Sequence, residues 1–527
     1  MIKKSSQSLL ARFVAWRGSD YVALIAGIGL LFALVLPTIT SASIWFDEAF
    51  SSYITQFSFY DIARYTATDV HPPLYYWLLK AWESVFGYNS ELAIRSMSLL
   101  FAAIATVFGF LLLRRLFGRK AAVLGLLFVV LSPVVVRYSA EARMYMVELT
   151  IILAATYTMV RALEQKKLGL WVVYGVLVGL GMWVHYFTAL AWLAHWAWRL
   201  AVVYQLGVRG KAFAKRFFSK EWITAHVIAI AIFLPWIPFM LYQLGIVQSS
   251  GFWIGPVGVD TPVNYVTTMF YYLDHGEVKG WFALALSAVL AAFIVMAVRV
   301  YRSFDTQKRQ SFLLILALAV VPVALLIIAS LPPLRSSFVE RYLIPSIVAT
   351  MLLFGIVAAY GLTKYNVWQR IVAVGIVVAL LAIGINNTYH YGNFNKNSDT
   401  HILTRQVVEG VNEKGEAGEP IIANSPWIFY EAVFYNSSEH PVYFIDADTD
   451  YWYGSLDMLK NNAMHKIVDV DAFIAEHPTI WYLGNTGDPE VTSERTDKWQ
   501  ALQTISTHDD IQNVNIYKAT QYRTSAE

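Results

Sequence analysis

The segment Ile44-Trp45-Phe46-Asp47-Glu48-Ala49-Phe50 places two adjacent carboxylates shortly after an apolar run, Tyr21 to Thr38. That run is long enough to cross a bilayer. Farther along, His71-Pro72-Pro73-Leu74-Tyr75-Tyr76-Trp77 places a rigid turn ahead of an aromatic segment. Charge at a membrane boundary beside fixed turn geometry indicates a functional site.

The composition around these stretches is that of a membrane protein. Of 527 residues, 57% are hydrophobic and only 15% are charged, against about 25% charged in soluble domains. Apolar runs of membrane-spanning length recur along the chain. We therefore expect a polytopic α-helical membrane protein with about 11 transmembrane helices. The expected spans are 21–40, 92–113, 121–137, 144–162, 170–184, 187–204, 222–243, 280–299, 311–331, 342–361 and 370–388.

Positive charge in alternate connections predicts the orientation of these spans. The Lys- and Arg-rich connections, expected to be cytoplasmic, are 114–120, 161–167, 209–220, 302–309 and 364–370. Residues 1–20 resemble a signal n-region, but no small-residue cleavage site follows, so we expect an uncleaved first span. The prediction is a plasma (bacterial inner) membrane protein with a cytoplasmic N-terminus. The outer side then carries 41–91, 138–143, 185–186, 244–279 and 332–341.

Charge also divides the chain into two expected domains. Residues 390–527 hold 21 Asp and Glu against 9 Lys and Arg, whereas residues 1–389 hold 16 acidic and 31 basic residues. Short strand patterns around a helical stretch predict a small extracytoplasmic α/β domain after residue 389. The expected strands are 420–423, 441–445 and 479–483, and the expected helix is 427–434.

The outer loop 41–91 is aromatic and half apolar, which predicts two interfacial helices, 47–60 and 74–85. The chain has no cysteine, which excludes disulfides, thiol catalysis and Cys-ligated zinc. The basic run 211–220 interleaves cations with aromatic residues, and a short cytoplasmic loop of this kind favours anionic lipid over nucleic acid. No nucleic-acid partner is expected.

Four motifs together resemble the GT-C superfamily of integral-membrane glycosyltransferases. They are Asp47-Glu48, His71-Pro72-Pro73-Leu74, Tyr138-Ser139-Ala140-Glu141-Ala142-Arg143-Met144-Tyr145 and Glu340-Arg341-Tyr342-Leu343-Ile344-Pro345. The nearest likeness is to protein O-mannosyltransferases and bacterial aminoarabinose-transferase-like enzymes. The resemblance implies a sugar donor on a polyprenyl phosphate in the outer leaflet and transfer with inversion. By similarity, Asp47 is the catalytic base.

The residues themselves fit such chemistry, with alternatives left open. Asp47 or Glu48 can take the acceptor proton, since apolar surroundings raise a carboxyl pKa; the alternative is a solvated pair just beyond a span. Spacing does not choose between them, and the resemblance favours Asp47. Arg143 and Arg341 can bind the departing phosphate, or else anchor headgroups or pair with Glu141 and Glu340, their neighbours in the chain.

Tyr145 and Tyr342 can donate to the same phosphate, or anchor the interface. His71, fixed by two prolines, and Glu141 are candidates for binding or orienting substrate; His71 can equally cap backbone in its turn. Glu48, His185 and His275 are candidate ligands of a divalent cation, although no HExxH spacing supports a metal. His195, within the aromatic stretch 192–198, is interpreted as a packed membrane histidine.

The sequence-level prediction is an inverting, polyprenyl-phosphate-sugar-dependent glycosyltransferase that acts on a protein, lipid or polysaccharide acceptor in the cell envelope. The alternatives are a lipid or solute transporter, which would need polar residues at mid-membrane, and a catalytically inactive scaffold of the same fold. The sugar, the hexosyl or pentosyl class, the acceptor, the prenyl length, metal dependence, the role of the C-terminal domain and the oligomeric state stay open.

Overall fold

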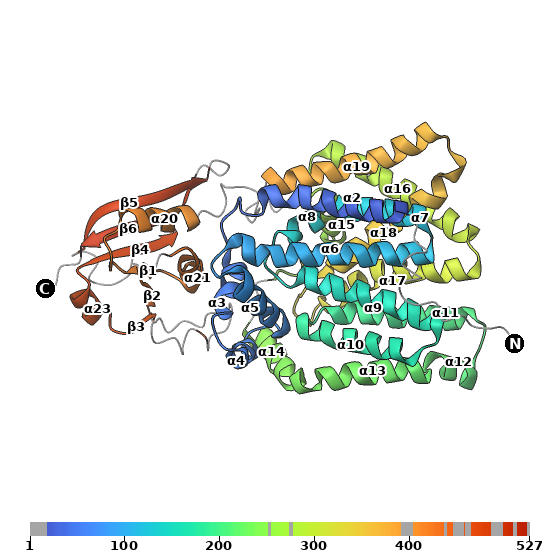
Figure 1. Ribbon diagram of the computed structural model, residues 1–527, viewed down its shortest axis with the longest axis horizontal. Coiled ribbons are helices and arrows are strands. Elements are labelled where there is room, and N and C mark those ends of the chain that lie inside the picture. Colours follow the sequence, from blue (N-terminus) through green and yellow to red (C-terminus); the bar gives the residue numbers. More distant parts are fainter. Residues whose placement is uncertain are drawn as a thin grey trace.

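The computed structural model describes residues 18–250, 254–272, 278–390, 404–436, 440–445, 458, 465–485, 499–509 and 514–523. A long helical bundle joins a small sheet-containing domain (Figure 1). The bundle helices are α2 (Gly18–Val35), α6 (Glu91–Leu116), α7 (Arg119–Val130), α8 (Pro133–Ser139), α9 (Tyr145–Gln165), α10 (Leu168–Val184), α11 (Thr188–Gln205), α13 (Lys220–Phe233), α14 (Ile237–Ser250), α16 (Gly280–Ser303), α17 (Thr306–Ala329), α18 (Ile344–Gly361) and α19 (Val367–His390).

Helix occurs at every expected span. Within the described residues, eight helices are long and apolar enough to cross a membrane, or nine if the bent pair α7 and α8 is one span. The chain is therefore a multi-span membrane protein. Helix α10 has 17 residues and falls short of that length, and α11 is not among the eight either. The count of eleven spans stays a prediction.

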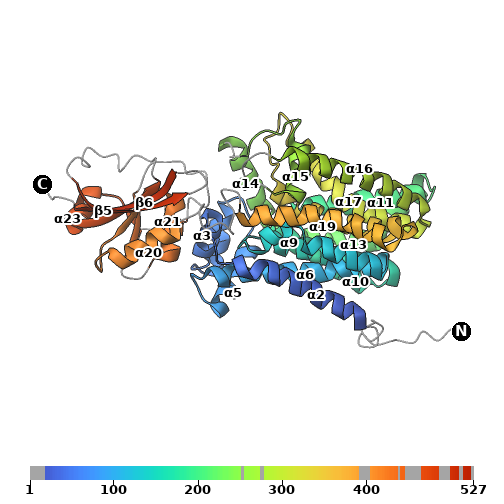
Figure 2. The same ribbon diagram turned by 90° about the horizontal axis from the view of Figure 1, so that it is seen from above.

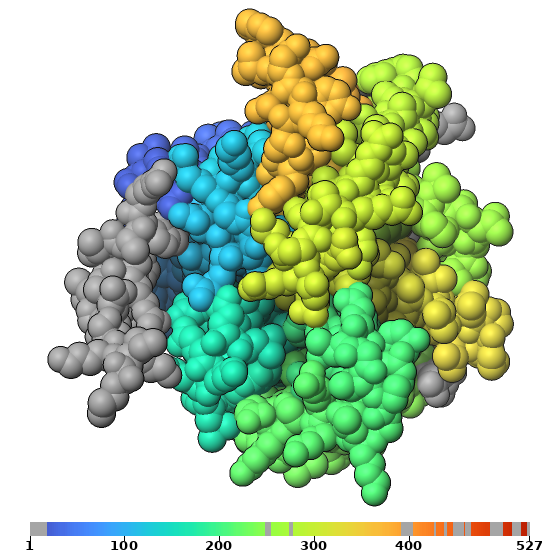
Figure 3. Space-filling view, turned by 90° about the vertical axis from the view of Figure 1, so that its right-hand side faces the viewer, coloured from blue at the N-terminus to red at the C-terminus, as the bar shows by residue number. Residues whose placement is uncertain are grey.

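The basic connections gather at the end of the bundle far from the sheet-containing domain, the end seen in Figure 3. Arg115 pairs with Glu164 at 2.5 Å, and the Tyr360 hydroxyl donates to the Phe117 carbonyl at 2.7 Å. Short helix α12 (Gly210–Phe217) is tied to α11 here, because Arg199 donates to the Phe217 carbonyl at 2.7 Å. Charge patterning thus separated the two ends of the bundle correctly.

The opposite end carries three short helices, α3 (Phe46–Ile54), α4 (Phe59–Ala67) and α5 (Leu74–Phe86). The expected helix 74–85 is confirmed as α5, but the single helix expected over 47–60 is wrong. The chain breaks after Ile54, and Ser58 starts α4 by accepting a hydrogen bond from the Asp61 amide at 3.1 Å. A serine N-cap of this kind begins a new helix where apolar periodicity alone suggests continuation.

The C-terminal domain has one six-stranded sheet in the order β3-β2-β1-β4-β6-β5. Strands β1 (Ile421–Ala423), β2 (Val442–Ile445), β3 (Lys466–Ile467) and β4 (Thr479–Asn485) pair in parallel, whereas β5 (Gln500–Asp509) and β6 (Val514–Arg523) join as antiparallel strands. The helices are α20 (Thr404–Lys414), α21 (Pro426–Tyr435) and α23 (Val470–Glu476). The predicted α/β class is confirmed, and the antiparallel pair is an addition to it. The proposed boundary at residue 389 stays a prediction.

The C-terminal domain lies against the end of the bundle that carries α3, in both views (Figures 1 and 2). The contact is aromatic: the Tyr430 ring of α21 lies 5.9, 5.8 and 5.0 Å, between ring centroids, from Phe46, Phe50 and Tyr53 of α3. Offset and edge-on aromatic pairs at these distances add to the free energy of apolar burial. The helix that carries Asp47 is therefore part of the interdomain contact.

Candidate active site

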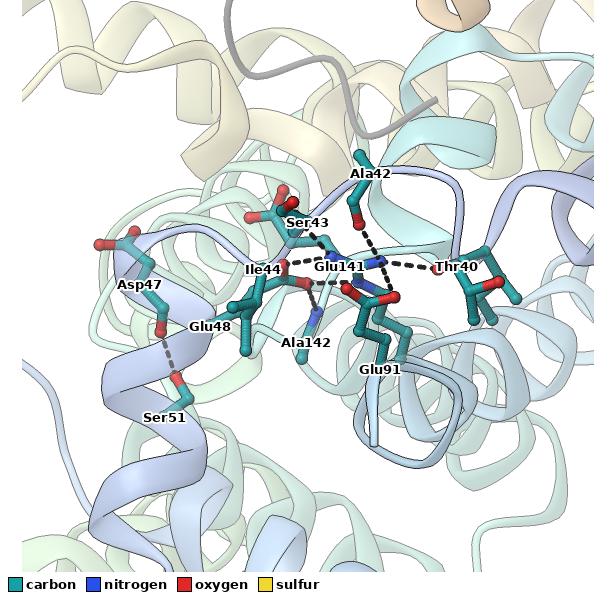
Figure 4. Close-up of polar contacts among 12 residues, drawn as sticks. Thr40, Ala42, Ser43, Ile44, Asp47, Glu48, Ser51, Glu91, Glu141 and Ala142 are labelled. Atoms are coloured by element: carbon teal, nitrogen blue, oxygen red, sulfur yellow. Dashed lines mark hydrogen bonds and ion pairs between the residues drawn. The ribbon is translucent and has the colours of Figure 1, made fainter. Parts of the chain in front are cut away.

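Asp47 and Glu48 occupy the first turn of α3 but point in different directions. Figure 4 shows the Asp47 carboxylate directed away from the polar network that holds Glu48. Glu48 is fully buried, whereas the Asp47 side chain is 21% exposed. Consecutive helical residues differ by about 100° around the axis, so one turn presents one carboxylate to the protein interior and the other to the accessible side.

Glu48 is held by a buried guanidinium. Arg95 of α6 donates to both carboxylate oxygens, at 3.2 and 3.0 Å, and the backbone amide of Ala142 adds a third bond at 2.8 Å. Arg95 is also fully buried. A carboxylate that is fully buried and bidentately paired is poorly placed to collect a substrate proton. The arrangement favours Glu48 as the anchor of α3 rather than as the base.

Asp47 faces Arg143 instead. The Arg143 Nε lies 3.7 Å from Asp47 Oδ2, and its Nη1 donates to Ser51 Oγ at 3.1 Å. Ser51 in turn donates to the Asp47 carbonyl at 2.6 Å. Arg143 is thus paired with Asp47, not with its neighbour Glu141. A partly exposed carboxylate beside a buried guanidinium offers one group to accept a proton and another to bind an anion.

Glu141 lies in a separate buried pair, in which Arg137 of α8 donates to its carboxylate at 2.6 Å. Arg137 and Glu141 are 3% and 1% exposed. Such a pair shapes the connection that presents Arg143 and the Ala142 amide. A direct role of Glu141 in orienting substrate stays a prediction.

His71 and His185 form a second group on the same end of the bundle. Their rings stack with centroids 6.0 Å apart. His71 Nδ1 lies 3.4 Å from Asp69, and His185 Nδ1 lies 2.8 Å from Glu148 of α9. Burial lowers the pKa of His71, while the Asp69 hydrogen bond opposes that shift and the Arg143 charge adds to it. His71 is therefore predominantly neutral above its lowered pKa, and one ring nitrogen is left to donate or accept.

The fourth motif, residues 340–345, also lies at the end of the bundle that carries Asp47. The guanidinium carbon of Arg341 lies 5.9 Å from the Trp45 ring, two residues before Asp47. The Tyr342 ring meets the His185 ring edge-on at 5.2 Å. The Tyr145 ring meets His185 edge-on at 5.9 Å. The four motifs, distant in sequence, thus converge on one end of the bundle.

The candidate metal ligands are not brought together. Glu48 and His185 are engaged with Arg95 and Glu148, respectively. Within the part of the chain that the structure describes, no three or more His, Cys, Asp or Glu side chains form a group that could hold a metal ion. His275 lies outside the described residues. The metal prediction therefore gains no support from the residues described.

Sequence reasoning missed the residues that hold this site together, namely Asp69, Arg95, Arg137, Glu148, Arg405 and Tyr435. Arg95 and Glu148 carried a usable signal, since a charge inside an apolar span needs a partner. Arg405 and Tyr435 carried none, because the C-terminal domain gives no hint from sequence of what it contacts.

Comparisons with known proteins bear on the fold that carries these residues. A family model described as dolichyl-phosphate-mannose-protein mannosyltransferase matches residues 70–239, a range that contains His71, Glu141, Arg143 and His185. No curated protein sequence matches the chain. ArnT from Cupriavidus metallidurans bound to undecaprenyl phosphate superposes with a TM-score of 0.60 at 12% identity, over 95% of this chain and 98% of ArnT. The chain therefore shares its fold with ArnT, as the resemblance to the GT-C superfamily leads us to expect.

Two further structures share the GT-C fold. The apo state of the same ArnT gives a TM-score of 0.61 at 11% identity, over 97% of this chain and 98% of that one. The apo oligosaccharyltransferase from Archaeoglobus fulgidus gives 0.51 at 10% identity, over 88% of this chain and 69% of that one. The resemblance inferred from four short motifs is therefore confirmed as to fold.

Proposed function

We propose that the protein is an inverting glycosyltransferase that moves a sugar from a polyprenyl-phosphate donor to an acceptor at the outer face of the membrane. The observation that carries the proposal is the pair Asp47 and Arg143, 3.7 Å apart at the accessible side of α3. The family match over residues 70–239 supports the reaction class. ArnT binds undecaprenyl phosphate, which supports a donor of the same chemical class here.

In the proposed reaction the acceptor hydroxyl attacks the anomeric carbon of the sugar. Asp47 takes the hydroxyl proton as the new glycosidic bond forms. The bond from the anomeric carbon to the phosphate oxygen breaks, and its electrons leave with the polyprenyl phosphate. Arg143 and Arg341 bind the phosphate as negative charge develops on it. Tyr145 and Tyr342 supply hydroxyl donors beside them.

The remaining site residues position these groups. Glu48 and Arg95 fix the first turn of α3, so that Asp47 cannot rotate into the interior. His71, held by Asp69 and stacked on His185, orients the donor phosphate or the acceptor. This division gives the two adjacent carboxylates separate tasks, proton transfer for Asp47 and anchoring for Glu48.

The outer face, the cytoplasmic N-terminus and the bacterial inner membrane remain parts of the proposal. They rest on the basic connections at the end of the bundle opposite to Asp47. With that orientation, the site opens to the leaflet where the donor is expected and to the acidic C-terminal domain.

The test is donor consumption by the purified protein in lipid nanodiscs, supplied with undecaprenyl-phosphate-linked sugars and membrane acceptors. We expect Asp47→Asn to lower the rate by about 10²–10⁴-fold, the range expected for loss of a general base. Asp61→Asn, in the first turn of α4, is the matched control and should keep the wild-type rate. Transfer that survives in Asp47→Asn would contradict the assigned base. In sealed proteoliposomes, lipid or solute movement across the membrane without donor consumption would replace the enzyme with a transporter.

A further inference from the structure

The turn from Ile39 to Ile44, which leads from the first span into α3, has no regular secondary structure. Five of its carbonyls and the Ile44 amide are nevertheless hydrogen-bonded, by side chains from two different domains. A segment whose hydrogen bonds come from outside takes its conformation from those partners.

The membrane domain holds one side of the turn. Arg95 of α6 donates to the carbonyls of Ile39, Ala42 and Ser43, at 2.8, 2.9 and 3.1 Å. The same guanidinium binds Glu48, so that the turn and the first residues of α3 share one buried cation. Figure 4 shows these bonds converging from Ala42, Ser43 and Glu48.

The C-terminal domain holds the other side. Arg405 of α20 donates to the carbonyls of Thr40 and Ser41, at 3.0 Å each. The hydroxyl of Tyr435, the last residue of α21, accepts a hydrogen bond from the Ile44 amide at 2.5 Å. That amide lies three residues before Asp47.

Glu91 of α6 links the two sides. Its carboxylate accepts a bond from Arg405 at 2.8 Å and another from the Tyr435 hydroxyl, and lies 3.9 Å from Arg95. Three charged groups and one phenol therefore enclose the turn, two from each domain. These contacts of the C-terminal domain with the turn adjoin the packing of Tyr430 against α3.

We propose that Arg405 and Tyr435 are positioning residues for Asp47: the C-terminal domain holds the 39–44 turn and so sets where the base stands. The catalytic part of this inference rests on the proposed function. The reason is geometric, because a reacting group displaced by about 1 Å can lose a factor of about 10² in rate. The domain then acts on the active site through the 39–44 turn.

The experiment uses the full chain in nanodiscs and compares Tyr435→Phe and Arg405→Gln with two control variants. Tyr443→Phe removes a hydroxyl from β2 of the same domain, and Lys414→Gln removes a charge from the end of the same helix α20. Hydrogen–deuterium exchange is followed in peptides that cover residues 39–50. Kinetics with an undecaprenyl-phosphate-linked sugar, and binding of undecaprenyl phosphate, are measured in parallel.

We expect exchange of the Ile44 amide to rise about fivefold in Tyr435→Phe, the effect of losing one net hydrogen bond. The kcat should fall about tenfold in both Tyr435→Phe and Arg405→Gln. The KM for the donor and the affinity for undecaprenyl phosphate should stay unchanged. The controls should match the wild type. A purely structural role would instead lower the amount of folded protein and leave kcat per folded molecule unchanged.

Unchanged hydrogen–deuterium exchange in Tyr435→Phe and Arg405→Gln would overturn the inference, whatever the activity of these variants. Faster exchange with unchanged kcat would overturn the positioning role. If the wild type consumes no donor at all, the proposed function fails instead, and exchange alone then decides whether the C-terminal domain holds the turn.

Discussion

The surroundings of His195 and those of Asp47 are both rich in buried polar groups, but their hydrogen-bond partners differ. That difference distinguishes a packed histidine from a candidate active site. His195 lies inside the bundle, fully buried, with both ring nitrogens 3.0 Å from a hydroxyl, those of Thr156 and Tyr174. Every polar atom of that ring is satisfied by a neutral partner. The sequence interpretation of His195 as a packed histidine agrees with this environment.

At the Asp47 end of the bundle the hydrogen-bond partners are charged, and one carboxylate is partly exposed. Glu48, Arg95, Arg137 and Glu141 are paired and buried, while Asp47 stays partly exposed beside Arg143. Paired charges cost desolvation free energy and are weak evidence for stability. The gathering of paired charges around the partly exposed Asp47 carboxylate therefore indicates a functional site. The fully satisfied hydrogen bonds of His195 to neutral hydroxyls indicate packing.

The largest effect should come from breaking the buried pair. Glu48→Gln removes the bidentate partner of the buried Arg95 guanidinium and leaves only Glu91, 3.9 Å away, as its counter-charge, which should lower the free energy of unfolding by about 3 kcal/mol. Equilibrium unfolding in detergent measures it, with Glu409→Gln on the exposed side of α20 as control. A cost below about 1 kcal/mol would contradict the anchoring role.

Arg143→Gln tests whether the guanidinium beside the partly exposed Asp47 binds phosphate. Removing a charged hydrogen-bond donor should weaken undecaprenyl phosphate binding by about 10–100-fold, since such bonds contribute about 1.5–3 kcal/mol. Ligand-dependent thermal stabilisation measures the affinity. Arg64→Gln, an exposed arginine of α4, should bind like the wild type. Equal affinities for all three proteins would remove Arg143 from the phosphate site.

Glu83 of α5 gives a pH-dependent effect of intermediate size. It lies against α3, with Ser52 and Thr55 hydroxyls 2.6 and 2.5 Å from its carboxylate oxygens. Burial raises its pKa to about 7, against the opposing hydrogen bonds and the Lys80 charge. The folded state then binds a proton that the unfolded state releases above about pH 4.5, so stability falls as pH rises from about 4.5 to 7 and levels off above.

Glu83→Gln should remove this pH dependence, because glutamine stays neutral. The difference in unfolding free energy between pH 5 and pH 7.5 should shrink by about 1–3 kcal/mol relative to the wild type. Melting temperatures at the two pH values measure it. Parallel pH profiles for the two proteins would place the titration elsewhere.

The smallest effect is expected at His195. His195→Leu leaves two buried hydroxyls without a ring nitrogen, and side-chain hydrogen bonds between membrane helices contribute about 0.6 kcal/mol on average. We expect a cost of about 1 kcal/mol and unchanged donor consumption. A loss of activity without a comparable loss of stability would show that the comparison between the two groups is wrong.

The sequence by itself determined the membrane class, the two ends of the bundle and the motifs that meet at one of them. Apolar run length and the distribution of Lys and Arg depend on local composition, so they are readable without contacts. Short strand patterns around a helical stretch likewise indicated the α/β nature of the C-terminal domain. The break between α3 and α4 was missed because apolar periodicity continued through it.

Only the tertiary structure separated Asp47 from Glu48. The two carboxylates are chemically alike and adjacent, and what distinguishes them is a guanidinium 47 residues away in sequence that reaches Glu48 alone. The same holds for Arg405 and Tyr435, more than 350 residues beyond the turn that they bind. Burial and partner choice depend on which segments pack together, and no local pattern encodes that.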